Sequence, residues 1–321
     1  MTSDNGTRPA PWSRPAAEQA AGLSSLPRPV AMVVGAGGVL GAAHVGIGQA
    51  LERRGFVPDM IIGTSVGALN GAITAAYPHQ AAPRLAHVWT ELRRRDVYQL
   101  GFLTSRTSIF TDRGLRRLIA DAELPRRIEQ LKVPFTAVAT DLATGDQVPL
   151  DHGDLETALL ASAAIPGILP PVHRGGRTLV DGGVTAYVPV LAAQQAGAAS
   201  VVVMSTGPES SLLPPAAPRR RAGAIIARAG VLLLHHQIER DLHEVSQRIP
   251  TIVLPTGTED WPAPWDFGHS HRLINTASRT AGHFIDELRI SGPGLYRGDN
   301  TTTPSARPDE PTNFTESGAS L

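Results

Sequence analysis

Apolar runs and helical patterns alternate along this chain, and the alternation predicts an α/β fold. The apolar runs are short, uncharged and rich in branched side chains, as buried strands are; they fall at 30–34, 60–62, 133–140, 200–204 and 251–254. Helical stretches lie between and after them, at 42–54, 81–95, 155–164, 189–196, 222–245 and 270–288. We also expect a hairpin where Thr144-Gly145 turns the third run back into a strand at 147–150.

Segments without periodicity bound the folded part of the chain. Residues 1–28 are rich in Pro, Ser, Ala and Arg, and residues 291–321 in Gly, Pro, Thr and Asp. We therefore expect a disordered leader and a disordered tail. A proline-rich linker at 208–218 separates the main domain, 29–205, from a helical extension, 206–290, that we expect to pack on the same domain.

The stretch from Met60 to Gly71 joins an uncharged strand to a helix that begins just after Ser65. Gly63 and Gly67 complete the pattern G-x-S-x-G around the serine. They remove the side chains that would clash when a serine at such a corner adopts a strained backbone conformation. The hydroxyl then stands clear of the sheet, at the positive end of the helix dipole. A plain strand–helix turn is the alternative, because the pentapeptide alone is a weak signal.

A glycine-rich turn, Gly35 to Gly41, connects the first strand to the first helix. Its backbone N–H groups could bind an anion, either a dinucleotide pyrophosphate or a reaction's oxyanion. The dinucleotide alternative fits poorly, because Leu40 occupies the third glycine position and Asp59 begins the second strand instead of ending it. A purely structural turn would leave the serine corner unexplained. Both turns belong to one βαβ unit, so they lie side by side where open α/β sheets bind ligands.

A candidate base follows the short apolar segment at 179–180. There the chain continues Asp181-Gly182-Gly183, which in isolation usually marks a turn. However, Asp181 ends a strand, and this is a position in which a catalytic carboxylate could act as a general base. A Ser–His–Asp triad would need a histidine after the acid, near the end of the chain. The candidates are His269, His271 and His283, and none of them follows an obvious strand.

Composition excludes several classes of function. With 321 residues, 42% of them hydrophobic, the chain can bury a large core. Its 29 basic and 29 acidic residues balance, so no global field attracts nucleic acid or anionic lipid. The absence of cysteine rules out disulfides, thiolate catalysis and cysteine-bound metals. No apolar run approaches the roughly 20 residues of a membrane-spanning helix and no signal peptide is visible, so we expect a cytoplasmic protein.

Neither a metal nor an organic cofactor is expected. The histidines of the helix predicted at 222–245 lack a carboxylate motif and are better explained as surface or packing residues; they are His235, His236 and His243. Residues 96–111 mix aromatic and polar side chains and fit either an apolar flap over a site or a packed loop. Any lipid contact should be peripheral and weakly dependent on salt, through the apolar side chains at 98–110, Trp261 and Trp265.

Four segments, in order and at compatible spacing between residues 29 and 205, together resemble the patatin-like phospholipase family. Their joint match is far more specific than any one motif. The segments are the glycine turn 35–41 with AHVG at 43–46, GTSVGALNG at 63–71, ASAAIPGILPP at 161–171 and DGG at 181–183. The predicted hairpin, with ATDL at 139–142, also resembles the family's central hairpin.

This resemblance implies a three-layer α/β/α fold with a mostly parallel central sheet. It also implies a lipid acyl hydrolase in which Ser65 is the nucleophile and Asp181 the base, with a seryl-ester intermediate. The amides of Gly37 and Gly38 would form the oxyanion hole. Other motif glycines would shape the turns around these groups; they are Gly35, Gly41, Gly63, Gly67, Gly182 and Gly183. Leu40 departs from the family pattern, where Arg or Lys is common, so a cation that could assist a phosphate head group is missing.

The chemistry also follows from the residues themselves. Serine is a weak nucleophile unless an adjacent base removes its proton. A carboxylate in a partly dry site can be that base. The alternatives are a thioesterase or transacylase with the same site, or a catalytically silent module that binds lipid or a protein partner. The presence of both Ser65 and Asp181 favours an enzyme.

Overall fold

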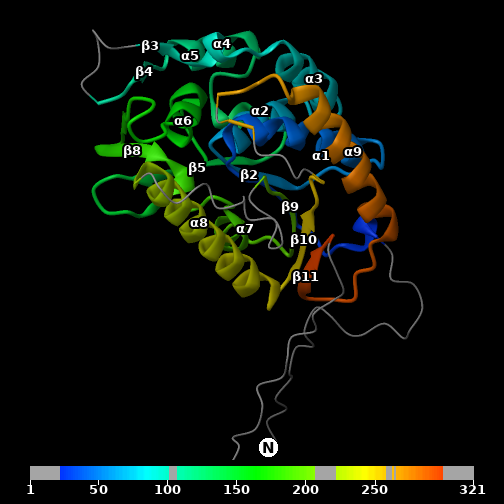
Figure 1. Cartoon of the computed structure of the whole chain (residues 1–321). Helices are drawn as coiled ribbons and strands as arrows, with labels where there is room; N and C mark the ends of the chain where they lie inside the picture. Colours follow the sequence, from blue (N-terminus) through cyan, green and yellow to red (C-terminus); the bar gives the residue numbers. More distant parts are fainter. Residues whose placement is uncertain (1–21, 101–106, 207–221, 258–261, 264, 299–321) are drawn as a thin grey trace, which may run out of the picture.

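A mixed sheet forms the centre of the molecule (Figure 1). It is seen in a computed structural model that describes residues 22–100, 107–206, 222–257, 262–263 and 265–298. Within these residues nine strands run in the order β11-β10-β9-β1-β2-β5-β8-β7, with β6 paired to β5 beside that path. The strands are β1 (Val30–Val34), β2 (Met60–Thr64), β5 (Phe135–Asp141), β6 (Gln147–Leu150), β7 (Val172–Arg174), β8 (Arg177–Asp181), β9 (Ser200–Met204), β10 (Pro250–Leu254) and β11 (Gly294–Arg297).

Most of the sheet is parallel. From β11 to β5 every neighbouring pair is parallel, whereas β6, β7 and β8 pair antiparallel. All residues of β1 and β9 are buried, which is expected of parallel strands covered on both faces. The predicted α/β fold with a mostly parallel sheet is confirmed, as is the hairpin of β5 and β6.

Helices cover both faces of the sheet (Figure 1). Alternate residues of β1 point to opposite faces: Met32 and Val34 pack with α1, α2, α6 and α9, and Ala31 and Val33 pack with α7 and α8. The helices are α1 (Ala42–Glu52), α2 (Val66–Ala76), α3 (Ala81–Glu91), α6 (Leu155–Ser162), α7 (Val190–Gln195), α8 (Ala222–Ser246) and α9 (Ser270–Glu287). In the described part of the chain, no helix has the length and apolar content needed to cross a membrane.

Two strands share one edge of β5, and their junction positions the candidate site. Ala137 has β2 on one side and β6 on the other, whereas Ala139 has β6 and β8 as neighbours. Because a residue has one neighbour on each side, β2 and β8 must lie on the same side of β5, end to end. β2 runs parallel to β5 and β8 antiparallel, so their carboxyl ends meet.

The helix predicted at 81–95 is divided in two. α3 ends at Glu91 because Leu92 and Arg93 are extended, and α4 (Arg94–Val97) follows. α4 packs closely on α5 (Arg113–Asp121), and a short pair of strands, β3 (Gln99–Leu100) and β4 (Phe110–Thr111), lies beside them. Together these elements form a cap over α2 and α6 (Figure 1).

Part of the predicted disordered tail, 291–321, is a strand instead. Gly294–Arg297 form β11, which pairs in parallel with β10 at the edge of the sheet. Tyr296 is buried there, and its hydroxyl donates to the carbonyl oxygen of Gly292 at 2.8 Å. A four-residue strand anchored by one aromatic side chain has no periodicity of its own, so composition alone predicted this stretch wrongly.

The predicted leader, 1–28, is ordered at its end. Leu23–Ser25 form a 3₁₀ turn, and Leu26 is buried in the main core. Residues 1–21 lie outside the described residues. One apolar side chain therefore extends the ordered chain a few residues before β1, where the polar composition predicted disorder.

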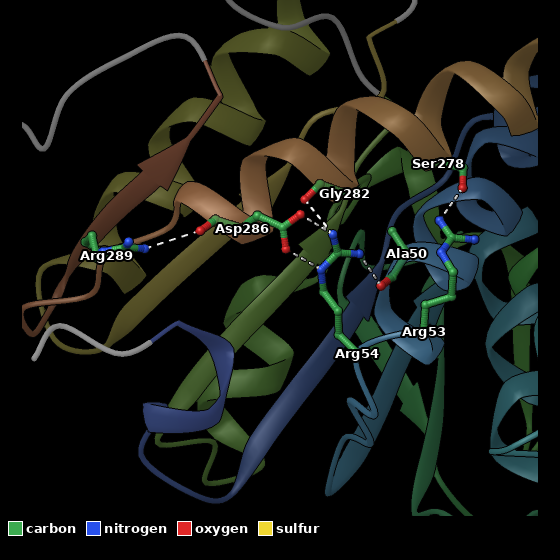
Figure 2. A network of polar contacts seen from close by, with 7 residues as sticks. All are labelled: Ala50, Arg53, Arg54, Ser278, Gly282, Asp286 and Arg289. Atoms are coloured by element: carbon green, nitrogen blue, oxygen red, sulfur yellow. Dashed lines mark hydrogen bonds and ion pairs between the residues drawn. The ribbon is translucent and has the colours of Figure 1, made fainter.

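Helix α9 is fastened to the end of α1 by two arginines (Figure 2). Arg54 binds both carboxylate oxygens of Asp286, through Nε at 2.8 Å and Nη2 at 2.6 Å. Its Nη2 also donates to the carbonyl oxygen of Gly282 at 2.9 Å. Arg53 Nη2 donates to Ser278 Oγ at 2.7 Å. The extension is thus tied to the first helix of the main domain.

We predict that Gly46→Ala destabilises the protein, because α1 and α9 touch at this glycine. A Cβ there would lie 2.1 Å from the carbonyl oxygen of Ile274 and 2.8 Å from the amide nitrogen of Ser278, both backbone atoms of α9. Forcing the helices apart should cost about 1–3 kcal/mol of unfolding free energy, measured by urea titration. Gly48→Ala is the matched control, since nothing lies within 4 Å of its Cβ. It should stabilise α1 by about 0.5–1 kcal/mol, and equal effects of the two changes would contradict the close contact.

Candidate active site

Ser65 occupies a strained corner between β2 and α2. Its φ of 56° and ψ of −127° are rare for a residue with a side chain. A Cβ at Gly67 would lie 2.2 Å from the carbonyl oxygen of Val34, and a Cβ at Gly63 would lie 2.6 Å from that of Gly67. The two glycines therefore let the turn approach β1 and the start of α2. The predicted strand–corner–helix geometry is present.

Asp181 faces Ser65 across the junction of β2 and β8. Ser65 Oγ donates a hydrogen bond of 2.6 Å to Asp181 Oδ2. The other carboxylate oxygen, Oδ1, accepts the N–H of Gly183 at 2.7 Å. Gly182 must also be small, because its Cβ would lie 2.2 Å from the carbonyl oxygen of Val138. The Asp-Gly-Gly segment thus orients one carboxylate oxygen towards the serine.

Burial changes the acid–base character of this carboxyl. Asp181 is 5% exposed and Ser65 6% exposed. Removal from water raises the pKa of Asp181 to about 6, although the hydrogen bonds from Ser65 and Gly183 act in the opposite direction. A carboxyl with this pKa is ionised at neutral pH and is a stronger base than an exposed aspartate.

The glycine turn places two free amides near Ser65. Gly37 has φ 155° and Gly38 has φ 55°, and Gly38 lines the same pocket as Ser65. Thr206 holds the turn by donating to the carbonyl oxygen of Ala36 at 2.6 Å, and a Cβ at Gly37 would lie 1.8 Å from Thr206 Oγ1. Within the described residues the N–H groups of Gly37 and Gly38 have no hydrogen-bond partner. Gly35 precedes this turn and bonds to β9 through its N–H.

Ser162 supports the corner, and its role was not anticipated from the sequence. Its Oγ accepts the N–H of Ser65 at 3.0 Å and donates to the carbonyl oxygen of Val138 at 2.6 Å. Ser162 is fully buried at the end of α6. It therefore ties the strained residue to β5. Its place in the segment ASAAIPGILPP gave no sign of this contact with Ser65.

Asn70 links the serine helix to the glycine turn. Its Nδ2 donates to the carbonyl oxygen of Gly41 at 3.0 Å, and its Oδ1 accepts the indole N–H of Trp89 at 3.1 Å. Gly41 is confined between Val66 and Trp89, since a Cβ there would lie 2.5 Å from Val66 Cγ2. This buried amide thus fixes the distance between the two turns. Asn70 lies within the segment GTSVGALNG, but the sequence analysis predicted no role for it.

An apolar pocket opens beside Ser65 and Gly38. It is lined mainly by side chains of α2, α3, α5 and α6, among them Leu69, Ile73, Leu85, Trp89, Leu115 and Leu159. Tyr98 and Phe267 close part of it, with ring centroids 6.4 Å apart. No charged side chain and no histidine is among the described lining residues. The pocket fits an uncharged, largely hydrocarbon group.

Among the described residues, no histidine lines the pocket or hydrogen-bonds to Ser65. His44 is buried in α1, where loss of water lowers its pKa to about 3, so its ring stays neutral. His269 contacts Asp266 at 3.1 Å at the start of α9. The remaining histidines considered above lie on α8 and α9. In the described part of the chain, no three metal-ligating side chains come together.

Comparison with known proteins identifies the family. The sequence model of the patatin-like phospholipase family matches residues 32–193, just over half of the chain. The chain therefore belongs to the patatin-like phospholipase family, and the identification made from its motifs is confirmed. The matched stretch runs from β1 to α7 and contains Ser65 and Asp181.

Similar proteins match about half of this chain and are longer than it. An uncharacterized NTE family protein of Mycobacterium bovis is 40% identical over 177 residues, 55% of this chain and 48% of that protein. Patatin-like phospholipase domain-containing protein 7 of Rattus norvegicus is 34% identical over 172 residues, 52% of this chain and 13% of that protein. The chain thus matches about half of the first relative and a small part of the second. VipD from Legionella pneumophila, a solved structure, gives a TM-score of 0.42 at 12% identity, covering 81% of this chain and 67% of VipD.

We predict that Asp181→Asn stabilises the folded protein at neutral and alkaline pH. The pKa of Asp181 is raised from 3.8 to about 6, so its proton favours the folded state between these values and stability falls as pH rises through them. A neutral amide avoids this loss, which amounts to about 3 kcal/mol once the carboxyl is ionised. Urea titrations across pH should show the gap between variant and wild type closing below about pH 4. Asp286→Asn, which removes an exposed partner of Arg54, should give no such gain.

Proposed function

We propose that the protein hydrolyses acyl esters of lipids through a Ser65–Asp181 dyad. The observation that carries this proposal is the 2.6 Å hydrogen bond from Ser65 Oγ to Asp181 Oδ2, beside an apolar pocket and two free amides. Membership of the patatin-like phospholipase family supports a lipid ester as the substrate class. The name of the rat relative, patatin-like phospholipase domain-containing protein 7, points to the same class.

Acylation begins at the serine hydroxyl. Ser65 Oγ attacks the carbonyl carbon while its proton passes to Asp181 Oδ2. Negative charge develops on the carbonyl oxygen, and the amides of Gly37 and Gly38 donate to it. In enzymes from which one such hydrogen-bond donor has been removed, the activation free energy rises by about 3–4 kcal/mol. The tetrahedral intermediate then expels the alcohol, which takes the proton from Asp181 and leaves an acyl group on Ser65.

Deacylation repeats the sequence with water. The oxygen of the water molecule attacks the seryl ester while Asp181 accepts a proton from that water. The second tetrahedral intermediate releases the carboxylic acid, and the proton returns to Ser65 Oγ. Atoms and charge balance with no added oxidant, metal or cofactor. A histidine is not needed, because the raised pKa of Asp181 makes its carboxylate an adequate base near neutral pH.

The pocket favours the acyl chain over a charged head group. Its described lining carries no charge, and the side chain of Leu40 is buried in a core cluster. Burial of hydrocarbon contributes about 0.8 kcal/mol per CH₂ group, so longer chains should bind better until the pocket is filled. We therefore place the acyl chain in the pocket and the alcohol portion at its mouth.

We predict that Ser65→Ala abolishes turnover of short p-nitrophenyl esters and that Asp181→Asn lowers kcat by about 10²–10⁴, the range expected for a lost general base. A fluorophosphonate probe should label the wild type at Ser65 only.

In the wild type, kcat should rise with pH through about 6, where Asp181 becomes ionised. Alanine at His269, His271 or His283 should change kcat less than about tenfold, or 1.4 kcal/mol. A histidine variant as inactive as Ser65→Ala, with Asp181→Asn still active, would contradict the dyad.

We also predict that filling the pocket shifts chain-length preference. Ala122 lines the pocket at the end of α5, so Ala122→Phe should lower kcat/KM for long-chain esters more than about tenfold and leave acetate esters little changed. Ala120→Phe, at an exposed position of the same helix outside the pocket, is the matched control. Equal losses for short and long esters would argue against an acyl pocket.

A further inference from the structure

The cap of the pocket carries a group of arginines on its outside. Arg93, Arg94 and Arg95 lie at the start of α4, and Arg113 and Arg117 lie on α5. All five side chains are exposed. We call these five residues the arginine face. None of them forms an ion pair within the described part of the chain.

Folding brings the two groups of arginines together. α4 and α5 touch where a Cβ at Gly114, next to Arg113, would lie 2.2 Å from the carbonyl oxygen of Asp96, next to Arg95. Residues 93–100 and 107–117 contain six arginines and two aspartates, a net charge of +4 in a chain whose total is zero. The charge is therefore concentrated at this place on the surface.

Nearby acids are already occupied. Asp96 Oδ2 accepts the N–H of Arg93 at 2.9 Å. Asp112 and Glu156 both bind Arg116, which is not part of the arginine face. Glu91 and Asp121 are exposed at the ends of α3 and α5. They reduce the positive potential only at the borders of the arginine face. Five cations thus remain available to an external anion.

Apolar side chains are exposed beside the arginine face. Leu100 in β3 is 67% exposed, Ile109 before β4 is 43% exposed, and Trp265 is 55% exposed. The guanidinium of Arg94 lies 5.9 Å from the centroid of the Trp265 ring. Trp261, which was also considered for lipid contact, lies outside the described residues. Cations and bare hydrocarbon therefore share one surface.

The same segments line the pocket with their inner side chains. Val97 and Tyr98 follow the arginines of α4, and Leu115 and Leu118 alternate with those of α5. An object bound at the arginine face would lie against the walls of the pocket that contains Ser65. The charged surface and the candidate site are thus two sides of one structural unit.

We propose that the arginine face, together with Leu100, Ile109 and Trp265, docks the protein on an anionic lipid bilayer. A bilayer offers phosphate and carboxylate groups to the arginines and, just below them, hydrocarbon to the three apolar side chains. A nucleic acid would bind the cations but would leave Leu100 and Ile109 in water. This proposal rests on the proposed function, because docking on a bilayer would deliver a lipid acyl chain to the pocket.

Salt dependence should consequently be strong. The balanced charge of the whole chain suggested a weak effect of salt, but a local cluster acts within a Debye length regardless of the total. Each arginine near an anionic surface should strengthen binding about fivefold. Removing three of the five should weaken it about 10²-fold.

The test measures co-sedimentation of the full chain with vesicles, in the Ser65→Ala background so that hydrolysis cannot alter the lipid. Vesicles of phosphatidylcholine alone are compared with vesicles that also contain phosphatidylserine. The variant combines R95Q, R113Q and R117Q. The matched control combines R248Q, R279Q and R289Q, three exposed arginines that lie after α8, on α9 and after α9. A further variant, L100S with W265S, tests the apolar contribution.

We expect binding to the anionic vesicles only, a loss of about 10²-fold in the first variant and less than about threefold in the control. Added salt should weaken binding, and the apolar variant should bind more weakly than the parent. Equal binding by both arginine variants, or equal binding to both vesicles, would overturn the proposal. Binding to RNA or an acidic protein without binding to vesicles would also overturn it.

Hydrolysis of a short soluble ester separates this proposal from the proposed function. With Ser65 restored, the variant lacking three arginines should turn over that ester like the wild type. Vesicle binding without any ester turnover would contradict the proposed function alone. Ester turnover without vesicle binding would contradict the docking surface alone.

Discussion

The hydrogen bond between Ser65 and Asp181 depends on how two strands meet along the edge of β5. β2 brings Ser65 to its carboxyl end from one direction, and β8 brings Asp181 to its carboxyl end from the other. Neither residue could reach its partner if β8 were parallel, because the carboxylate would then lie at the opposite end of the strand. The glycine turn after β1 completes the arrangement, since β1 pairs in register with β2.

This junction stores unfavourable free energy that the surrounding contacts must offset. A non-glycine residue with the backbone angles of Ser65 costs about 1–3 kcal/mol, and ionising the buried Asp181 costs about 3 kcal/mol. Together these are a large part of the 5–15 kcal/mol by which domains are usually stable. Ser162 and Gly183 limit the loss, because each donates or accepts a hydrogen bond at the strained groups. These two residues therefore help to maintain the geometry of the pair formed by Ser65 and Asp181.

The fold class, and Ser65 and Asp181 as candidate site residues, could be predicted from the sequence because each has a local signature. Buried parallel strands are short apolar runs, and G-x-S-x-G and D-G-G are contiguous patterns. Ser162 and Asn70 escaped prediction, since their partners lie on other strands and helices and only tertiary packing reveals them. β11 escaped for the same reason: its pairing with β10 and the burial of Tyr296 are supplied by the fold, not by its four residues. The arginine face could not be predicted either, because nothing in the spacing of its two groups of arginines shows that α4 and α5 touch.

The Ser65–Asp181 pair and the walls of the pocket come from different kinds of segment. Ser65, Asp181 and the glycine turn lie at the ends of rigid strands within the part of the chain that matches the family. The pocket also needs Phe267, which lies beyond that part and whose ring is 6.3 Å from that of Trp89. Phe267 lies just before the N-cap of α9, separated from it only by Gly268, and Arg54 and Arg53 bind α9 to the end of α1. The contacts between α1 and α9 therefore also hold one wall of the pocket that opens beside Ser65.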